Sequence, residues 1–418
     1  MAALDERDRA LATRLVMGSV AAEGELDRVI DAHLRRGGRL EPRVRDALRI
    51  AVFEALYLST PTYVSTSQGV ELVRSVAPRV AGLANAVLHR VVDEDLPVLV
   101  AARDRVETGD FTEDDLARAG ALPAWLVSAV VSSCGRDAAR RVALSALDAA
   151  PLYVGANRAR HSVDETFSLL ADAGCEPVAC EVEGAFELGR PSALAASGLV
   201  EAVDVLPADL AAQYVAQAVA PRPGKAALEV GQGRGTKTVL MESAALAAGG
   251  PAKIVAVDVD EAKACVSRHR MKDAGIAAHT LTVVLDATLL GGPDLPSALD
   301  RDFDVVFVDA PCSGTGTMRR HPEIAWSLTP EVVDPAREDS LPSLQLRILR
   351  AAASRVRVGG TLAYATCSLL AEEDERVVEG FLESAEGAGF ELAAERGRVS
   401  LDDGRSDTHF LARLTRME

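Results

Sequence analysis

The first third of the chain has apolar residues at the spacing of helices. Val44, Leu48, Ala51, Ala55 and Leu58 recur at intervals of three or four, which places them on one face of a helix. Few polar residues interrupt this stretch, so the pattern predicts a helix at the centre of an all-α bundle.

The segments that follow continue the helical pattern. One helix is predicted with Val70, Leu72 and Val73 on its apolar face and with Ser65 or Ser67 as its N-cap. Further helical segments are predicted over residues 80–92 and 110–148, with a helix start in LPAWL at 122–126. We therefore assign residues 1–140 to a helical domain.

After Pro151 the pattern changes to short strands and one helix. LYVGAN at 152–157 predicts a strand, Ser162 begins a capped helix that runs to 173, and 178–188 predicts one or two strands. Residues 150–212 therefore form a small α/β module, in which Cys175 and Cys180 are interpreted as packing residues.

From Pro221 onward, strands alternate with helices, which is typical of a doubly wound sheet. Leu346, Leu349, Ala353 and Val356 predict one face of the helix before the fifth strand. Strands are predicted at 226–230, 254–257, 281–285, 305–308, 361–365 and 410–414. The fold class is thus multidomain, with a Rossmann-like α/β domain over residues 213–418.

Composition narrows the class of protein. The 418 residues are 48% hydrophobic without an apolar run of about 18, and the N-terminus is charged from residue 5, so we expect a cytoplasmic protein without a membrane span. The six cysteines include no CxxC pair, which argues against a disulfide framework and a metal site. The net charge of −17 argues against a nucleic-acid partner, but binding depends on local clusters of positive charge.

Two cysteines stand where buried strands are predicted to end. FDVVFVDAPCSGTGT at 303–317 carries Asp309 and Cys312, and GGTLAYATCS at 359–368 carries Cys367. A single cysteine in such a place usually packs as a small hydrophobe. Two of them leaving strands at one edge of a sheet form a candidate catalytic pair.

A glycine-rich turn after the first strand of the sheet predicts a nucleotide-type cofactor. The turn has the form acid-x-Gly-x-Gly-x-Gly, which by itself would also suit NAD. Asp258 suits ribose hydroxyls, Asp286 suits an adenine amino group, and Asp309 lies beside the candidate cysteine, which favours S-adenosylmethionine; each aspartate could instead cap a helix. The predicted cofactor-binding residues are Gly231, Gln232, Gly233, Arg234, Gly235, Thr236, Lys237, Asp258, Asp286 and Asp309.

A cysteine pair beside such a cofactor suits methylation of a pyrimidine carbon. A thiolate that adds to carbon 6 of cytosine makes carbon 5 nucleophilic toward a sulfonium methyl group, and a base must then remove the carbon 5 proton. Cys312, Cys367 and Asp309 can share these roles, and the residues alone leave open which cysteine attacks.

Longer motifs give the chain a family resemblance. DAPCSGTGTMRRHPEIAW at 309–326 and GGTLAYATCSLLAEED at 359–374 resemble the Sun/RsmB family of bacterial RNA 5-methylcytosine methyltransferases. ERDRALATRLVMGSV, LRIAVFEALYL and LANAVLHRVV resemble the NusB-like domain, which binds RNA or partner proteins. The resemblance implies small-subunit (16S) ribosomal RNA as substrate, with ribosomal assembly intermediates as further partners.

The resemblance also implies a role for each site residue. Cys367 attacks the base, Cys312 assists elimination, and Asp309 holds the base and cofactor region. DNA cytosine methyltransferases use the Pro-Cys cysteine as the nucleophile, and in that alternative Cys312 and Cys367 exchange roles.

Arginines are the candidate RNA contacts. Arg319 and Arg320 directly follow the reactive loop, and His321 beside them could be catalytic, or could cap or pack. In the helical domain Arg35, Arg36 and Arg39 begin an arginine-rich stretch that continues to residue 49; a solvated helix face is the alternative interpretation.

Three motifs depart from the family pattern. GQGRGTKT at 231–238 has Arg234 where proline is usual, ADLAA surrounds Asp209 where QDEAS is usual, and SDTHFLARL stands where DGFF is common. The altered turn motivates an alternative, a NusB-like RNA-binding or antitermination scaffold that has lost catalysis. The intact cysteine motifs argue against it, and an amino-group methyltransferase would need a polar-Pro-Pro-aromatic loop where DAPC stands.

Overall fold

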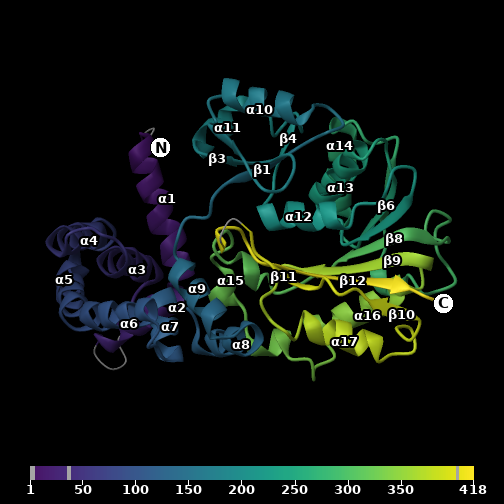
Figure 1. Cartoon of the computed structure of the whole chain (residues 1–418). Helices are drawn as coiled ribbons and strands as arrows, with labels where there is room; N and C mark the ends of the chain where they lie inside the picture. Colours follow the sequence, from purple (N-terminus) through teal and green to yellow (C-terminus); the bar gives the residue numbers. More distant parts are fainter. Residues whose placement is uncertain (1–4, 35–38, 402–403) are drawn as a thin grey trace. The chain divides into compact units, whose positions relative to one another are not determined.

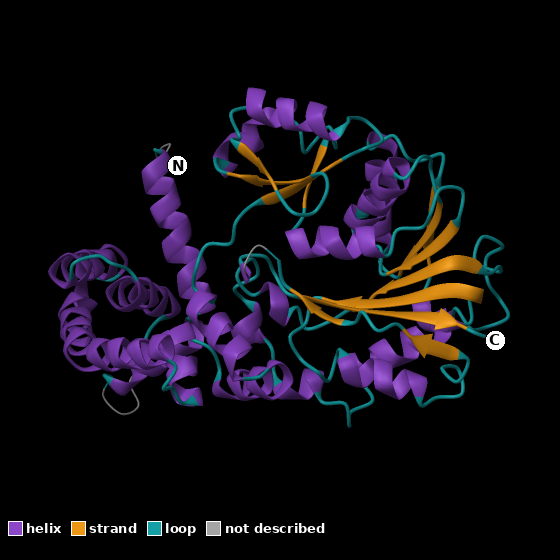
Figure 2. Cartoon of the chain, viewed as in Figure 1, coloured by secondary structure: helices purple, strands orange, loops and turns teal. Residues whose placement is uncertain are grey.

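The computed structural model describes residues 5–34, 39–401 and 404–418. The chain forms two compact units, here called the helical unit (residues 1–149 with 318–330) and the α/β unit (150–317 with 331–418). Figures 1 and 2 show the helices and strands of each unit.

The helical unit is built around α3 (Pro42–Tyr57). Val44, Leu48 and Ala51 of its predicted apolar face are buried, and Leu58 lies just beyond the helix end. The other helices of residues 5–149 are α1 (Glu6–Ala21), α2 (Glu23–Ala32), α4 (Thr62–Val76), η1 (Pro78–Val80), α5 (Ala81–Arg90), η2 (Val91–Asp95), α6 (Leu96–Thr108), α7 (Glu113–Gly120), α8 (Ala124–Cys134) and α9 (Arg136–Ser145). The predicted all-α bundle is confirmed.

The predicted serine cap of α4 is wrong. The helix begins at Thr62, and Pro61 occupies the N-cap position with φ −55° and ψ 135°, without a side-chain cap. Ser65 lies inside the helix, and its hydroxyl donates to the carbonyl of Thr62. The residue before the first helical position is therefore a proline and not a serine.

A segment distant in sequence belongs to the helical unit. Residues 318–330 include α15 (Ile324–Ser327), and the indole Nε1 of Trp326 donates to the carbonyls of Ala21 and Ala121, both at 3.0 Å. Gly24 lies against the same ring, where a Cβ would be 2.1 Å from it. The sequence predicted this segment as part of the domain at 213–418, because it lies within that part of the chain. Position along the chain does not show which hydrophobic core a side chain joins.

The α/β unit begins with a four-stranded antiparallel sheet in the order β2-β3-β1-β4. Ser162 caps α10 as predicted, and Cys175 is fully buried among apolar side chains. The elements are β1 (Tyr153–Ala156), α10 (Val163–Asp172), β2 (Pro177–Ala179), β3 (Ala185–Leu188), α11 (Pro191–Ser197) and β4 (Val205–Pro207).

The larger sheet has the order β10-β12-β9-β8-β5-β6-β7, and β11 pairs with β12. Strands β5 to β9 are parallel, whereas β12 and β10 run antiparallel to their neighbours. The strands are β5 (Ala226–Val230), β6 (Lys253–Asp258), β7 (Thr280–Val284), β8 (Phe303–Asp309), β9 (Val356–Thr366), β10 (Phe390–Leu392), β11 (Gly397–Val399) and β12 (His409–Arg416). All six predicted strands are present.

Helices cover both faces of this sheet (Figure 2), and an apolar core fills each interface. One face carries α16 and α17, and the other carries α12, α13 and α14. Their bounds are α12 (Leu210–Ala218), α13 (Thr236–Ala247), α14 (Glu261–Asp273), α16 (Leu341–Ala353) and α17 (Glu375–Leu382), with the short turns η3 (Ala287–Leu289), η4 (Thr315–Thr317) and η5 (Pro330–Val333). The predicted doubly wound fold is therefore confirmed.

One predicted helix position is wrong. Val356 lies in β9 and pairs with Phe303, because α16 ends at Ala353 and the chain turns at Ser354 and Arg355. The turn is fixed by two hydrogen bonds to the carbonyl of Leu290, from Ser354 Oγ (3.3 Å) and Arg355 Nε (2.8 Å).

No single helix in the described ranges has the length and apolar character to cross a membrane. The consecutive helices α7 and α8 satisfy both criteria only when taken together, and the chain bends by 115° between them.

Candidate active site

The two predicted cysteines meet at the carboxyl edge of the sheet. Strands β8 and β9 are parallel neighbours, and Asp309 at the end of β8 is in register with Ala365. The Sγ atoms of Cys312 and Cys367 are 3.2 Å apart, and the backbone N–H of Cys367 donates to Cys312 Sγ at 3.3 Å. Both sulfurs therefore belong to one site.

The surroundings make the two thiols unequal. The hydrogen bond from the Cys312 thiol lowers the pKa of Cys367, and the ammonium group of Lys237 lowers it further, although burial acts in the opposite direction. The same hydrogen bond, together with burial and the negative charge on Cys367, raises the pKa of Cys312 well above that of a free thiol. Cys367 is consequently the better thiolate of the pair.

Lys237 links the glycine turn to the reactive loop. Its Nζ lies 2.7 Å from Asp309 Oδ2, in an ion pair whose two side chains are mostly buried. The sequence predicted both residues for the site, but only the fold shows that they pair beside Cys367.

The glycine turn brings backbone very close to the end of β8. Gly231 has a φ of +87°, and a Cβ there would lie 2.2 Å from the carbonyl oxygen of Asp309. Gly233, with a φ of +57°, has nothing within 4 Å of its Cβ position, and its N–H donates to Asp258 Oδ2 at 2.7 Å. The turn therefore needs glycine at residue 231 because of the close packing there. At residue 233 the backbone is open, as it would be where a ligand approaches closely.

A buried polar group lies under this turn. Burial raises the pKa of Glu229 to about 8; its Oε2 accepts from Thr238 Oγ1 at 2.5 Å, and Thr238 accepts from Gln232 Nε2 at 3.1 Å. In the described ranges neither Glu229 Oε1 nor Gln232 Oε1 has a hydrogen-bond partner. The open glycine turn and Asp258 at the end of the neighbouring strand fit an adenosine-type cofactor.

Comparison with known proteins extends this picture. A family model described as 16S rRNA methyltransferase RsmB/F matches residues 216–405, and a NusB family model matches residues 1–93. Ribosomal RNA small subunit methyltransferase B of Thermus thermophilus is 31% identical over 384 residues, which cover 90% of this chain and 79% of that protein. The chain belongs to the RsmB/F family of 16S rRNA methyltransferases.

A second relative and a solved structure are similar to this chain over nearly its whole length. Ribosomal RNA small subunit methyltransferase B of Salmonella paratyphi B is 28% identical over 98% of this chain and 91% of its own length. The crystal structure of PH0851 covers 97% of this chain and 89% of its own, with a TM-score of 0.73 and 23% identity, which supports the fold. The chain is thus a small-subunit rRNA methyltransferase with an N-terminal NusB-like domain.

The remaining acids predicted to bind the cofactor lie at the same sheet edge. Asp258 also accepts the N–H of Asp260 (2.9 Å), so its carboxylate is fixed by backbone groups. Exposed Asp286 follows β7 and caps η3 by accepting the N–H of Thr288 at 2.9 Å, as the alternative interpretation allowed. Of the turn residues, Arg234 is exposed, and Thr236 accepts from Arg270 at 2.7 Å.

Of the predicted RNA contacts, the structure describes Arg39, Arg319 and Arg320. Arg35 and Arg36 lie outside the described residues, and Arg39 is exposed. Arg319 and Arg320 are half-buried in the segment that joins the helical unit. Exposed His321 in that segment lies 3.6 Å from Glu323.

Within the arginine-rich stretch, two side chains are committed to internal ion pairs. Arg45 contacts Asp27 and Asp31, and Arg49 contacts Asp27 at 2.6 Å and Glu23 at 2.9 Å. These pairs join α3 to α2, so Arg45 and Arg49 contribute to the packing of two helices.

The sequence did not reveal the acids behind the cysteines. Glu373 and Asp374 are fully buried, and Asp374 accepts from Thr366 Oγ1 at 2.5 Å and pairs with Arg398 at 3.0 Å. Burial raises the pKa of Asp374 to about 8. Their sequence signal is the run of three acids in LLAEED, which resembles any exposed helix start.

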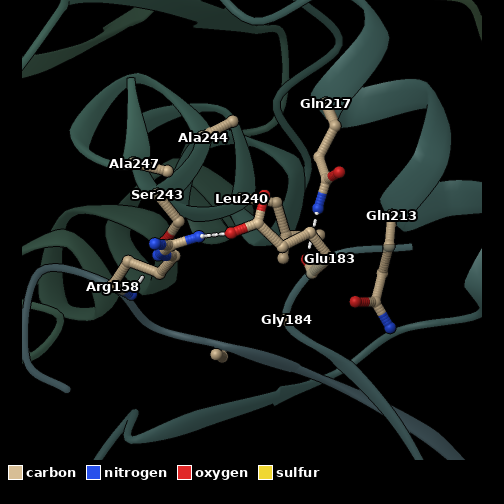
Figure 3. Close-up of a pocket in the computed structure, with 10 residues that line it drawn as sticks. Arg158, Glu183, Gly184, Gln213, Gln217, Leu240, Ser243, Ala244 and Ala247 are labelled. Atoms are coloured by element: carbon tan, nitrogen blue, oxygen red, sulfur yellow. Dashed lines mark hydrogen bonds and ion pairs between the residues drawn. The ribbon is translucent and has the colours of Figure 1, made fainter. Parts of the chain in front are cut away.

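A separate cavity of about 200 Å³ lies between the small sheet module, α12 and α13 (Figure 3). Arg158 and Glu183 form an ion pair of 2.6 Å at its wall, and Gln217 Nε2 donates to the carbonyl of Glu183. It shares no lining residue with the cysteine pair or the glycine turn. Among the described residues, no cluster of three His, Cys, Asp or Glu side chains is arranged to hold a metal ion.

Proposed function

We propose that this family member methylates carbon 5 of a cytosine in 16S ribosomal RNA through a covalent adduct with Cys367. The observation that carries the proposal is the 3.2 Å pair of sulfurs, of which Cys367 has the lowered pKa, beside a turn that fits S-adenosylmethionine. When bound, this cofactor supplies a methyl group on a positively charged sulfur. The base must be unstacked, because the attack needs access to its face.

Each step has a group to perform it. The thiolate of Cys367 forms a bond to carbon 6, and the electron pair of the carbon 5–carbon 6 double bond moves to carbon 5, which takes the methyl group. Loss of the carbon 5 proton then restores the double bond and releases Cys367 as a thiolate. Asp309, which is held by Lys237, would hold the base.

The adduct itself would prepare Cys312 to act as the base. Once Cys367 is a thioether, its negative charge and its role as hydrogen-bond acceptor are gone, and these are causes of the raised pKa of Cys312. Cys312 can then release its proton to water and accept the carbon 5 proton. The order of the two roles thus follows from the coupling between the sulfurs.

The experiment is methyl transfer from labelled S-adenosylmethionine to small-subunit rRNA, offered as naked RNA and as assembly intermediates, with bisulfite sequencing of the product. The expected result is one cytosine that becomes resistant to conversion. Labelled RNA without a protected cytosine would reject carbon 5 as the target. No heat of binding with the cofactor in calorimetry would instead favour a scaffold that has lost catalysis.

A further inference from the structure

Glu373 lies six residues after Cys367, and its side chain is fully buried behind the cysteine pair. Its carboxylate accepts four hydrogen bonds. Oε1 accepts from Ser313 N at 2.8 Å and from Gln345 Nε2 at 3.0 Å, and Oε2 accepts from Ser368 Oγ at 2.6 Å and from Ser313 Oγ.

These donors come from both reactive loops. Ser313 is the residue after Cys312, and Ser368 is the residue after Cys367. The third donor, Gln345 of α16, also donates to the carbonyl of Pro311 at 2.8 Å. One carboxylate therefore joins the neighbours of both cysteines to a helix of the core.

Further hydrogen bonds fix the two loops against each other. The N–H of Gly316 donates to the carbonyl of Cys367 at 2.9 Å, and the N–H of Leu369 donates to Thr315 Oγ1 at 2.8 Å. The backbone of Glu373 is also held, because Tyr364 donates its hydroxyl to the Glu373 carbonyl at 2.5 Å. The carboxylate thus has a fixed position from which to hold both loops.

We propose that Glu373 is a positioning residue for methyl transfer, which holds the loops of Cys312 and Cys367 so that the two sulfurs work as a pair. It touches neither sulfur in the contacts described above and acts through Ser313 and Ser368. The inference rests on the proposed function, because holding the two loops together matters for catalysis only if both sulfurs react at the same base.

Glu373→Leu keeps the size of the side chain and removes all four hydrogen bonds. We expect kcat to fall by about 10²-fold with KM for RNA nearly unchanged, because a displacement of about 1 Å at reacting groups has that effect. Glu373→Gln should recover most of kcat, since its amide can accept two of the bonds and donate two to serine hydroxyls that rotate. Glu372→Leu is the matched control: it removes the adjacent carboxylate, which pairs with Arg376 on the surface.

A second readout measures the sulfur pair without methyl transfer. Phenylarsine oxide forms two As–S bonds with a pair of adjacent thiols and releases one water molecule, so its binding reports whether both sulfurs are within reach. We expect the full-length parent chain, Glu373→Gln and Glu372→Leu to bind phenylarsine oxide tightly. Glu373→Leu should bind it at least about tenfold more weakly. Cys312→Ala, in which only one thiol of the pair remains, is the reference for weak binding.

The two readouts separate failure of this inference from failure of the proposed function. Wild-type kcat and arsenical binding in Glu373→Leu would overturn the positioning role. Suppose that every variant and the parent are inactive on RNA, that arsenical binding weakens in Glu373→Leu toward the single-thiol reference, and that Glu373→Gln and Glu372→Leu bind as the parent does. That result would reject the proposed function and retain the role of Glu373 in holding the pair. If Glu373→Leu does not fold, Ser368→Ala removes one of the four bonds to the carboxylate, together with the hydrogen bond that Ser368 Oγ accepts from the N–H of Leu370. It should lower kcat and arsenical binding together, and unchanged values would overturn the inference.

Discussion

At the scale of single residues, the reactivity of Cys367 depends on its charged neighbours. Lys237 lowers the pKa of this thiol from a side chain that is itself paired with Asp309. A lowered pKa means that the thiolate exists above that pKa and is lost as the pH falls through it.

Lys237→Met should therefore raise the pH at which Cys367 becomes reactive. The substitution removes a positive charge and leaves Asp309, whose negative charge raises the pKa of Cys367, without its partner. The measurement is the rate of iodoacetamide alkylation at Cys367, followed by mass spectrometry across pH. Lys225→Met is the control, since Lys225 pairs with Asp304 near the start of β5; equal profiles for Lys237→Met and the parent would contradict the assignment.

Gly231 and Gly233 of the cofactor turn form a matched pair for substitution. Gly231→Ala would place a Cβ 2.2 Å from the carbonyl of Asp309, whereas Gly233→Ala meets nothing within 4 Å and only adopts a strained positive φ. We expect Gly231→Ala to cost about 3 kcal/mol or more and to abolish cofactor binding, and Gly233→Ala to cost about 1–2 kcal/mol. Thermal unfolding and calorimetry with S-adenosylmethionine measure both effects, and equal losses in the two variants would contradict the close contact at Gly231.

At the scale of elements, periodicity predicted most of the fold and only part of the site. The central helix α3 and the strands β5, β6, β8 and β9 were predictable because each buries an apolar face or run. The cysteine pair was predictable because two strands end beside each other in a parallel sheet. The pairing of Lys237 with Asp309 and the burial of Glu373 were not, because both depend on contacts between segments far apart in sequence.

The packing of the segment around Trp326 also depends on contacts between distant parts of the chain, and it can be tested within the helical unit. Gly24 is the second residue of α2, and a Cβ there would lie 2.1 Å from the Trp326 ring; Gly82 is the second residue of α5 and has open space. Gly24→Ala should displace the ring and destabilise the unit by about 1–3 kcal/mol, whereas Gly82→Ala should stabilise it by up to about 1 kcal/mol. Urea unfolding followed by Trp326 fluorescence, with Trp125 replaced by Phe, measures both, and equal midpoints would contradict the packing of this segment.

At the scale of the whole molecule, buried acids should make stability fall as the pH rises. The pKa values of Glu229 and Asp374 are both raised to about 8 in the folded chain, from ordinary values of 4.5 and 3.8. Between those limits the folded state binds more protons than the unfolded state, so the free energy of unfolding decreases with pH. Each group contributes at most about 1.4 kcal/mol per pH unit.

Glu229→Gln tests this dependence, because the amide can still accept from Thr238 and does not ionise. The expected outcome is a smaller loss of melting temperature between about pH 5 and pH 8 than in the parent, whereas Glu372→Gln, at a partly exposed position, should leave the loss unchanged. Parallel curves for Glu229→Gln and the parent would mean that Glu229 is ionised in the folded chain.

A covalent complex with RNA tests most directly whether Cys367 is the nucleophile. With labelled small-subunit rRNA and S-adenosylmethionine, Cys312→Ala should accumulate a protein–RNA adduct that survives a denaturing gel, because Cys367 can attack but release is slow. Cys367→Ala should show neither adduct nor methylation. An adduct with Cys367→Ala and none with Cys312→Ala would reverse the roles of the two cysteines and contradict Cys367 as the nucleophile.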